Sequence, residues 1–194
     1  MRYRSGVIQK TRVNVATESI FVAAAIPKDV ATVLAATFQQ YPQHIKLKVR
    51  QEKWHVTFAW LGQQQNYQAF LAALLKPMRQ TYLPTLHITH VGRGVVRHQL
   101  WAYANPSVVV VNLHERLQQR LSQLKISLPE TKQQRPEFVQ HVHLANLYNM
   151  SRGIGIADYA VNLSFAIKEL QIYVSRPADH STSYHELGSI KLTS

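Results

Sequence analysis

The sequence predicts an α+β fold, and three observations support this prediction. Segments with the alternating pattern of a β-strand are interspersed with segments whose apolar residues recur at helical spacing. Two strand-like segments at 85–91 and 98–104 stand close enough in sequence to form a hairpin. A seven-residue phrase at 55–61 recurs at 141–147 with four of seven positions identical. Mixed strands and helices with local hairpins are typical of the α+β class.

The first half of the chain reads as strand, helix, strand and helix. Residues 19–26 form a buried apolar strand, and Pro27 then stands where a first helical turn accepts proline. Residues 53–62 form the strand that contains the first copy of the phrase, and Gly62 ends it. Asn66 is predicted to cap the next helix. The apolar stripe of that helix consists of Phe70, Leu71, Leu74, Leu75 and Met78.

The second half repeats this order. Residues 92–94, with two glycines, supply the turn of the hairpin. Another helix follows the hairpin, and a polar connector at 129–136 leads into the second copy of the phrase. After a glycine-containing loop at 151–155, strands are predicted near 167–174 and 187–192. The apolar side of the helix after the hairpin consists of Leu113, Leu117, Leu121 and Leu124.

Composition limits the class of protein. The chain has 194 residues, 46% of them hydrophobic, which is enough to bury a substantial core. Residues 1–18 show little periodicity and are interpreted as a basic N-terminal arm, and residues 19–194 as a single domain. No apolar run approaches the roughly 18 to 20 residues that cross a bilayer, so we expect a cytoplasmic protein with no membrane partner. The absence of cysteine excludes disulfides, thiolate metal sites and cysteine nucleophiles.

The charge balance indicates an anionic partner. Lysine and arginine outnumber aspartate and glutamate by 22 to 10, giving a formal net charge of +12. Phosphates are attracted to such a surface, so nucleic acid is the leading candidate. A generally basic protein without such a partner is the alternative.

The repeated phrase places a histidine beside a polar partner in each copy. Side chains alternate across a strand, so His55 shares a face with Thr57 and His141 shares a face with His143. Histidine titrates near neutrality, and two facing imidazoles can act as base and acid in one phosphoryl transfer. Thr57 and His143 can donate hydrogen bonds to phosphate oxygens.

Other interpretations of these residues remain open. Each histidine can be an ordinary strand residue, and His141 and His143 at i and i+2 can both reach one metal ion. No third or fourth ligand is evident, so we expect neither a metal nor another cofactor. The tryptophans are interpreted as packing residues. They are Trp54, Trp60 and Trp101.

In the order and surroundings of these motifs, the chain resembles the 2H phosphoesterase superfamily. The resemblance is to its RNA 2',3'-cyclic phosphodiesterase branch, also called the 2'-5' RNA ligase or LigT-like family, and it covers the chain from about residue 19. The motifs that carry it are Phe21-Val22-Ala23-Ala24-Ala25-Ile26-Pro27, His55-Val56-Thr57-Phe58 with Leu61-Gly62, Leu100-Trp101-Ala102, Arg135-Pro136 ahead of His141-Val142-His143-Leu144-Ala145, and Leu170-Gln171-Ile172-Tyr173.

The resemblance implies a bilobal α+β fold in which two antiparallel sheets are related by a pseudo-twofold axis, with helices packed outside and a groove between the lobes. It implies metal-independent opening of a 2',3'-cyclic phosphate, at an RNA end or in a small cyclic nucleotide, to a 2'-phosphate. Ligation of 2'-5' ends is a further activity of the family. His141 would activate water and His55 would protonate the departing 3' oxygen, while Thr57 and residue 143 hold the phosphate. We expect a monomer.

The sequence departs from the family pattern at His143, where threonine is usual. An imidazole is larger than a hydroxyl and can tighten the pocket, shift the pKa of His141 or change the favoured substrate. Arg152 is either a phosphate contact or a solvent-exposed residue, and Tyr148 either stacks on a base or packs against the protein. Two alternatives stay open. One is an RNA-binding module with weak or no catalysis, and the other is a 2H phosphodiesterase for a 2'-5' oligonucleotide or an ADP-ribose cyclic phosphate.

Overall fold

The computed structural model describes residues 18–37, 41, 45–64, 66–95, 98–105, 107–126, 128–129, 138–148, 157–178 and 181–193. The secondary structure elements, in chain order, are β1 (Ser19–Ala25), α1 (Lys28–Thr37), β2 (Ile45–Lys48), the 3₁₀ helix η3 (Gln51–Lys53), β3 (His55–Gly62), α2 (Gln68–Leu74), β4 (Met78–Arg79), β5 (Thr85–Arg93), β6 (Gln99–Asn105), α3 (Val108–Gln123), β7 (His141–Leu147), β8 (Tyr159–Ala166), β9 (Glu169–Ala178) and β10 (Ser181–Thr193).

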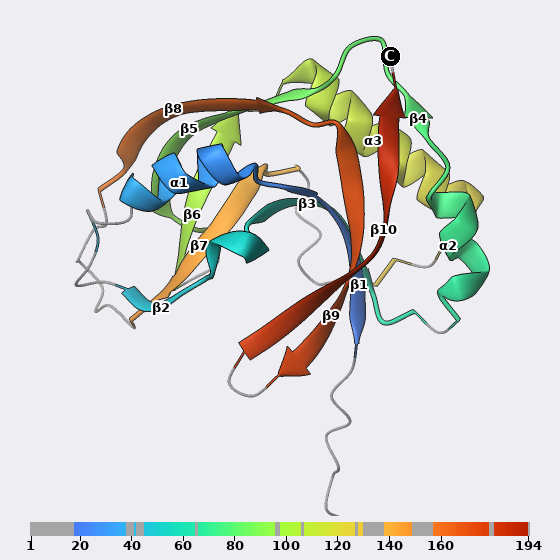
Figure 1. The fold of residues 1–194 in the computed structure, drawn as a ribbon, viewed down its shortest axis with the longest axis horizontal. Coiled ribbons are helices and arrows are strands. Elements are labelled where there is room, and N and C mark those ends of the chain that lie inside the picture. Colours follow the sequence, from blue (N-terminus) through green and yellow to red (C-terminus); the bar gives the residue numbers. More distant parts are fainter. Residues whose placement is uncertain are drawn as a thin grey trace, which may run out of the picture.

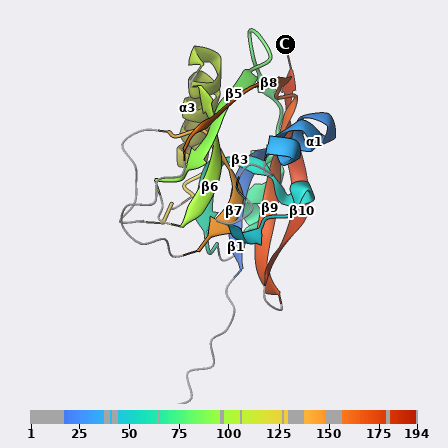
Figure 2. The same cartoon turned by 90° about the vertical axis from the view of Figure 1, so that its left-hand side faces the viewer.

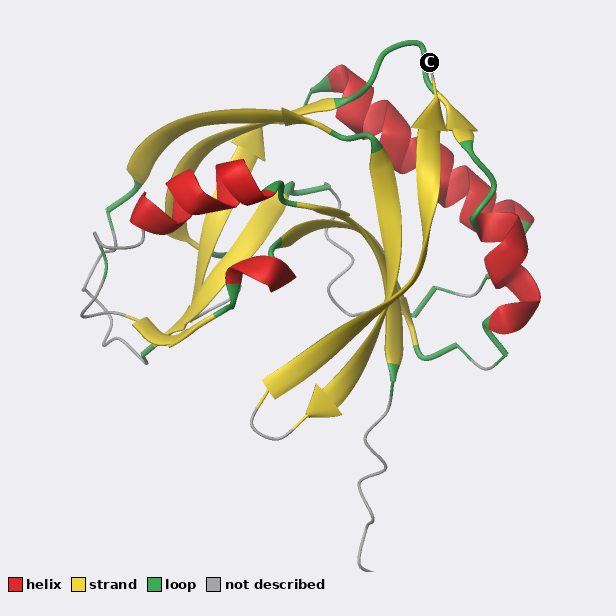
Figure 3. Ribbon diagram, viewed as in Figure 1, coloured by secondary structure: helices red, strands yellow, loops and turns green. Residues whose placement is uncertain are grey.

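The strands of the described part form one hydrogen-bonded sheet (Figures 1 and 3). Its order is β4-β10-β9-β1-β3-β7-β6-β5-β8, and β2 pairs with β7 off this path. The two inner strands, β3 and β7, are the two copies of the repeated phrase. On one side of them lie β1, β9, β10 and the short β4, and on the other lie β6, β5 and β8. Each half thus places its histidine strand innermost, which agrees with the pseudo-twofold order that the resemblance implies.

The two halves meet at a narrow seam. Strands β3 and β7 pair at Val56 and Val142, both of which are buried. Farther along β7, β2 pairs with it through Leu47 and Lys48. Because β2 leads through η3 directly into β3, residues 48–54 cross the opening between the two inner strands. The two expected sheets are therefore the halves of one continuous sheet.

Strand β1 is central to its half of the sheet. It pairs with β3, where Ala25 lies opposite His55, and with β9, where Ser19 lies opposite Ser175. All its residues from Ile20 to Ala24 are buried. Such a continuous apolar run is expected for a strand covered on both faces, as the sequence predicts.

The helices cover the sheet from different sides. Helix α1 contacts β8 and η3, whereas α3 contacts β3 and β5, and Figure 2 shows α1 and α3 on opposite sides of β5, β6 and β7. The predicted leucine side of α3 is buried at Leu113, Leu117 and Leu121. The guanidinium of Arg120 donates hydrogen bonds to carbonyl groups at and just beyond the end of α2, including that of Leu74 at 3.2 Å. Within the described ranges, no helix has both the length and the apolar character needed to cross a membrane.

Several local predictions are wrong. Asn66 does not cap α2 with its side chain: Tyr67 precedes the helix, and Asn66 adopts a φ of 58° while its carbonyl accepts from the amide of Ala69. The helix ends at Leu74, so Met78 belongs to β4. Strand β5 continues through the glycine-containing turn predicted at 92–94 as far as residue 93, because its pairing with β6 extends that far. Strands β2, β4 and β8 were not predicted. All but the last residue of the expected arm at 1–18, most of the connector at 129–136 and the loop at 151–155 lie outside the described residues.

Candidate active site

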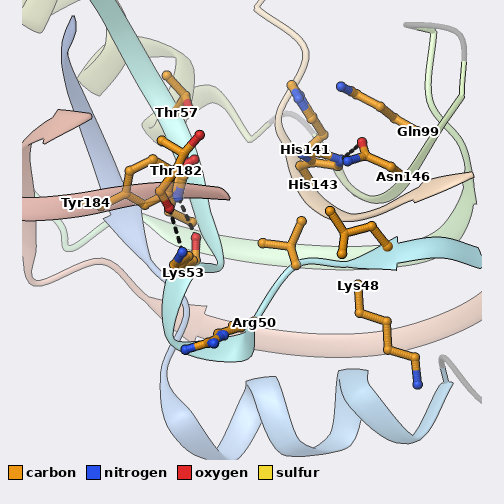
Figure 4. A pocket seen from close by; sticks show the side chains of 13 residues that line it. Lys48, Arg50, Lys53, Thr57, Gln99, His141, His143, Asn146, Thr182 and Tyr184 are labelled. Carbon is orange, nitrogen blue, oxygen red and sulfur yellow. Dashed lines mark hydrogen bonds between the residues drawn. The ribbon is translucent and has the colours of Figure 1, made fainter. Parts of the chain in front are cut away.

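A cleft of about 720 Å³ opens at the seam between the two halves. Both copies of the repeated phrase contribute to it, together with the crossing segment 48–54 and the start of β10. Figure 4 shows Thr57 and Tyr184 on one side of the cleft and His141, His143 and Asn146 on the other. Its polar lining residues are Lys48, Arg50, Lys53, His55, Thr57, Gln99, His141, His143, Asn146, Thr182 and Tyr184.

Strand alternation brings the histidines into this cleft, as the sequence predicts. In β3 and β7 the residues at the polar positions are half-buried, while the apolar residues between them are buried. Val56 and Val142 thus hold the strands in the core while His55 and His141 line the cleft. Thr57 and His143 each follow their histidine by two residues, so they face the same way and also line the cleft.

Both catalytic candidates are tethered in the same way. Nδ1 of His55 lies 2.7 Å from the carbonyl oxygen of Lys53, and Nδ1 of His141 lies 2.9 Å from that of Val139. A carbonyl can only accept, so Nδ1 carries the proton in both rings and the lone pair of each neutral imidazole lies on Nε2. The two halves therefore fix the same tautomer, with Nε2 as the nitrogen that exchanges protons.

Aromatic contacts fix the orientation of the two rings. The ring of Trp101 stacks on His141 with centroids 3.6 Å apart and an interplanar angle of 20°. Phe21 lies against His55 at 4.9 Å, and the edge of Tyr184 meets the same imidazole at 5.5 Å. Each imidazole is thus held by a carbonyl at one atom and by an aromatic ring at its face.

Burial affects the protonation of the site. Burial lowers the pKa of His55 below its ordinary value of 6.5, and this outweighs the opposing hydrogen bond to the Lys53 carbonyl. The nearby His143 lowers the pKa of His55 further. Burial also lowers the pKa of His143, against the hydrogen bonds to Ala145 and Asn146. At neutral pH the free protein therefore holds both imidazoles mainly in the neutral form.

The ring of His143 has the opposite tautomer. Its Nε2 lies 3.1 Å from the carbonyl oxygen of Ala145 and 3.1 Å from Oδ1 of Asn146. Because the backbone carbonyl can only accept, Nε2 carries the proton and Nδ1 of the neutral ring is an acceptor. His143 can therefore offer a further donor only when it is protonated, whereas Thr57 carries a hydroxyl that can donate at any pH.

The start of β10 closes one side of the cleft. Nζ of Lys53 donates to the carbonyl oxygen of Thr182 at 2.5 Å and lies 5.9 Å from the ring centroid of Tyr184. This contact joins η3, which precedes the first histidine strand, to a strand near the other end of the chain. It places a cation close to both His55 and the aromatic ring that contacts it.

The remaining sequence candidates are not part of the described wall. Tyr148, directly after β7, is 55% exposed and does not line the cleft. Arg152 lies outside the described residues. Conversely, Gln99, Asn146, Thr182 and Tyr184 line the cleft without having been predicted. Only Asn146 had a signal, because it belongs to the second copy of the phrase, where the first copy has tryptophan.

Metal ligands do not cluster in the described part of the chain. No three His, Cys, Asp or Glu side chains there are close enough together to hold an ion.

The sequence matches no protein-family model and no curated protein. Solved structures do match the fold. A structure described as a phosphoesterase is similar with a TM-score of 0.74 at 21% identity, covering 91% of this chain and 99% of the other. Escherichia coli LigT in its apo form is similar with a TM-score of 0.73 at 21% identity, covering 92% and 99%. LigT complexed with 3'-AMP gives 0.71 at 20% identity with the same coverage. The chain therefore has the fold of LigT and of this phosphoesterase, as the resemblance in its sequence implies.

Proposed function

We propose that this protein hydrolyses 2',3'-cyclic phosphates, at RNA ends or in small cyclic nucleotides, to 2'-phosphates by two-histidine acid and base catalysis. The observation that carries the proposal is the matched pair of imidazoles. His55 and His141 come from equivalent strands, line one cleft and share the tautomer that presents Nε2. LigT, which has the same fold, is known in complex with 3'-AMP, and this supports a nucleotide substrate.

The proposed reaction needs one imidazole neutral and the other protonated. The base removes a proton from water, whose oxygen attacks phosphorus, and the bond from phosphorus to the 3' oxygen breaks. The acid gives its proton to that oxygen, leaving a 3' hydroxyl and a 2'-phosphate. Thr57 donates a hydrogen bond to a phosphate oxygen. Following the resemblance, we assign His141 as the base and His55 as the acid.

The low pKa of His55 bears on this assignment. Burial favours neutral His55 in the free protein. Only the less populated, protonated form of His55 can therefore act as the acid at neutral pH. A bound phosphate anion beside the ring favours the imidazolium and offsets part of this effect.

The proposal is tested by incubating the protein in excess EDTA with a 2',3'-cyclic mononucleotide and with an oligoribonucleotide that ends in the same group. We expect metal-independent turnover with a 2'-phosphate as the product. A 3'-phosphate product would contradict the proposed bond cleavage. Salt-sensitive binding without turnover would favour the RNA-binding alternative, and turnover of only 2'-5' linkages or ADP-ribose cyclic phosphate would favour the other phosphodiesterase.

The pH dependence follows from the burial of His55. We expect kcat/KM to be bell-shaped against pH, with the midpoint of its acidic limb below 6.5. The sign follows because below the lower pKa of the pair both imidazoles are protonated, and no base remains. Initial rates across pH, with an NMR titration of the His55 ring, measure this. An acidic limb centred above 6.5 would show that burial does not control this ionisation.

Replacing His143 by threonine separates its role from that of a hydroxyl donor. We expect His143→Thr to lower KM for a cyclic phosphate about fivefold at pH 8, because a hydroxyl donates there and neutral Nδ1 does not. In the parent protein, KM should fall as the pH drops through the lowered pKa of His143. His87→Thr, an exposed strand histidine outside the cleft, is the matched control. A parent KM that is independent of pH and unchanged by the substitution would contradict this role.

A further inference from the structure

A second groove lies beside the cleft and shares a wall with it. Its volume is about 710 Å³, and it runs between α1 and the crossing segment 48–54. Lys48, Val49 and Arg50 line both the groove and the cleft. The crossing segment is therefore a thin wall, with the two histidines on one side and α1 on the other.

The basic side chains of this wall are directed toward the groove. In Figure 4, Lys48 extends from the crossing segment toward α1, and Arg50 lies across the turn on the same side, away from His141 and His143. The side chain of Arg50 is 79% exposed, and its ion pair with Glu52 has an N–O distance of 3.9 Å. An exposed pair of this length contributes little, about 0 to 1 kcal/mol. The guanidinium can therefore exchange this carboxylate for a phosphate.

The opposite wall of the groove is made of small side chains. Thr32, Ala35 and Ala36 on α1 line it, and the Thr32 hydroxyl already donates to the carbonyl of Lys28. Small residues let a polymer backbone approach the helix closely. Trp54 forms part of the base; it is 3% exposed, and its indole N–H donates to the Val49 carbonyl at 3.0 Å. This hydrogen bond fixes the backbone between Lys48 and Arg50.

We propose that this groove binds the nucleotides that precede the reacting one in a single-stranded RNA. The inference rests on the proposed function: the cyclic phosphate occupies the cleft, and the chain leading to it crosses Lys48 and Arg50 into the groove. Phosphates of the strand contact these two cations while its backbone lies against the small residues of α1. The preferred substrate is then an oligoribonucleotide end and not a cyclic mononucleotide.

The experiment compares kcat/KM for a 2',3'-cyclic mononucleotide and for a six-nucleotide strand with the same 3' end. The informative variant is Ala36→Glu, which places a negative charge in the groove without touching the cleft. The control Ala36→Gln introduces a side chain of nearly the same size as glutamate but without its charge. Val33→Glu puts the same charge at a 54% exposed position of α1 that does not line the groove.

We expect the parent to prefer the oligonucleotide, and Ala36→Glu to raise KM for the oligonucleotide about fivefold or more at low salt. Mononucleotide kinetics should stay at the parent value, and Ala36→Gln and Val33→Glu should behave like the parent. Arg50→Ala should reduce the preference for the oligonucleotide and lower the slope of log KM against log salt by about 0.7, as expected for one lost phosphate contact.

Failure of this inference differs from failure of the proposed function. Equal kinetics of Ala36→Glu and Val33→Glu on both substrates, with turnover intact, would overturn the groove and leave the catalytic proposal standing. If neither the parent nor any variant turns over either substrate, the proposed function fails. Binding of the unreacted strand, measured by fluorescence anisotropy, then tests the groove by itself. Weaker binding by Ala36→Glu alone would support the groove, and equal binding by all variants would overturn it.

Discussion

Replacing either His55 or His141 by alanine is expected to lower kcat for cyclic phosphate hydrolysis by about 100- to 10,000-fold. This is the usual contribution of a positioned general acid or base, about 3 to 5 kcal/mol of the barrier. Because the two imidazoles act in one transition state, the double variant should be little worse than the poorer single variant. Steady-state rates of the three variants in EDTA measure this. Independent, multiplying losses would indicate that the two rings do not act in one step.

A substrate with sulfur at the 3' bridging position separates the two roles. A thiolate leaves without needing a proton, so it removes the need for the acid but not for the base. We therefore expect this substrate to restore much of the rate of His55→Ala and little of that of His141→Ala. The reverse pattern would exchange the two assignments and would agree with the burial of His55, which favours its neutral form.

The control for both variants is His87→Ala. His87 is an exposed strand histidine that interacts with Ser164 and does not line the cleft. It should keep the activity of the parent. Retained turnover in His55→Ala and in His141→Ala, at parent-like thermal stability, would contradict the two-histidine mechanism.

Replacing Trp101 by alanine is expected to reduce the free energy of unfolding by about 3 to 5 kcal/mol and also to reduce kcat. Trp101 is 1% exposed, its Nε1 donates to Oε1 of Gln99 at 2.8 Å, and its ring stacks on His141. The indole fits because Gly94 has no side chain: a Cβ there would lie 2.7 Å from the ring. Urea unfolding and steady-state kinetics measure the two effects.

Trp101→Phe distinguishes packing from positioning of His141. It keeps an aromatic ring against the imidazole but loses the hydrogen bond to Gln99, so it should recover most of kcat while stability stays below that of the parent. If Trp101→Phe is as inactive as Trp101→Ala although it is clearly more stable, the stack on His141 is not what supports activity. An unchanged unfolding free energy in Trp101→Ala would contradict the packing role.

The strands and the helix that could be predicted have a clear repeating pattern. Strand β7 spans the second copy of the phrase, and the buried leucines of α3 follow the predicted helical side. Strand β8 was missed although every second residue, Val161, Leu163 and Phe165, faces the core, because only Phe165 is fully buried and the strand is otherwise exposed. Strand β2 has four residues, too few to show a period.

The site was predictable only where a local pattern marks it. Repetition of the phrase identified the two histidines and their neighbours because strand faces follow from sequence alone. The contact of Lys53 with Thr182 depends on residues far apart in the chain, which are brought together by sheet pairing. The tautomer of His143 depends on its Nε2 lying within hydrogen-bond distance of the carbonyl of Ala145 and of Oδ1 of Asn146, and no residue pattern encodes that geometry.

The position of β1 affects the order in which the protein can acquire its structure on the ribosome. β1 emerges early, yet one of its two neighbours is β9, with Ser19 opposite Ser175. Strands β5 and β6 follow one another directly in the chain and can pair much sooner, whereas β1 presents an unpaired apolar edge until β9 is synthesised. Such long-range pairing slows folding and leaves an aggregation-prone edge exposed. The half of the molecule containing His55 should thus be the last to form and the one most dependent on chaperones during synthesis.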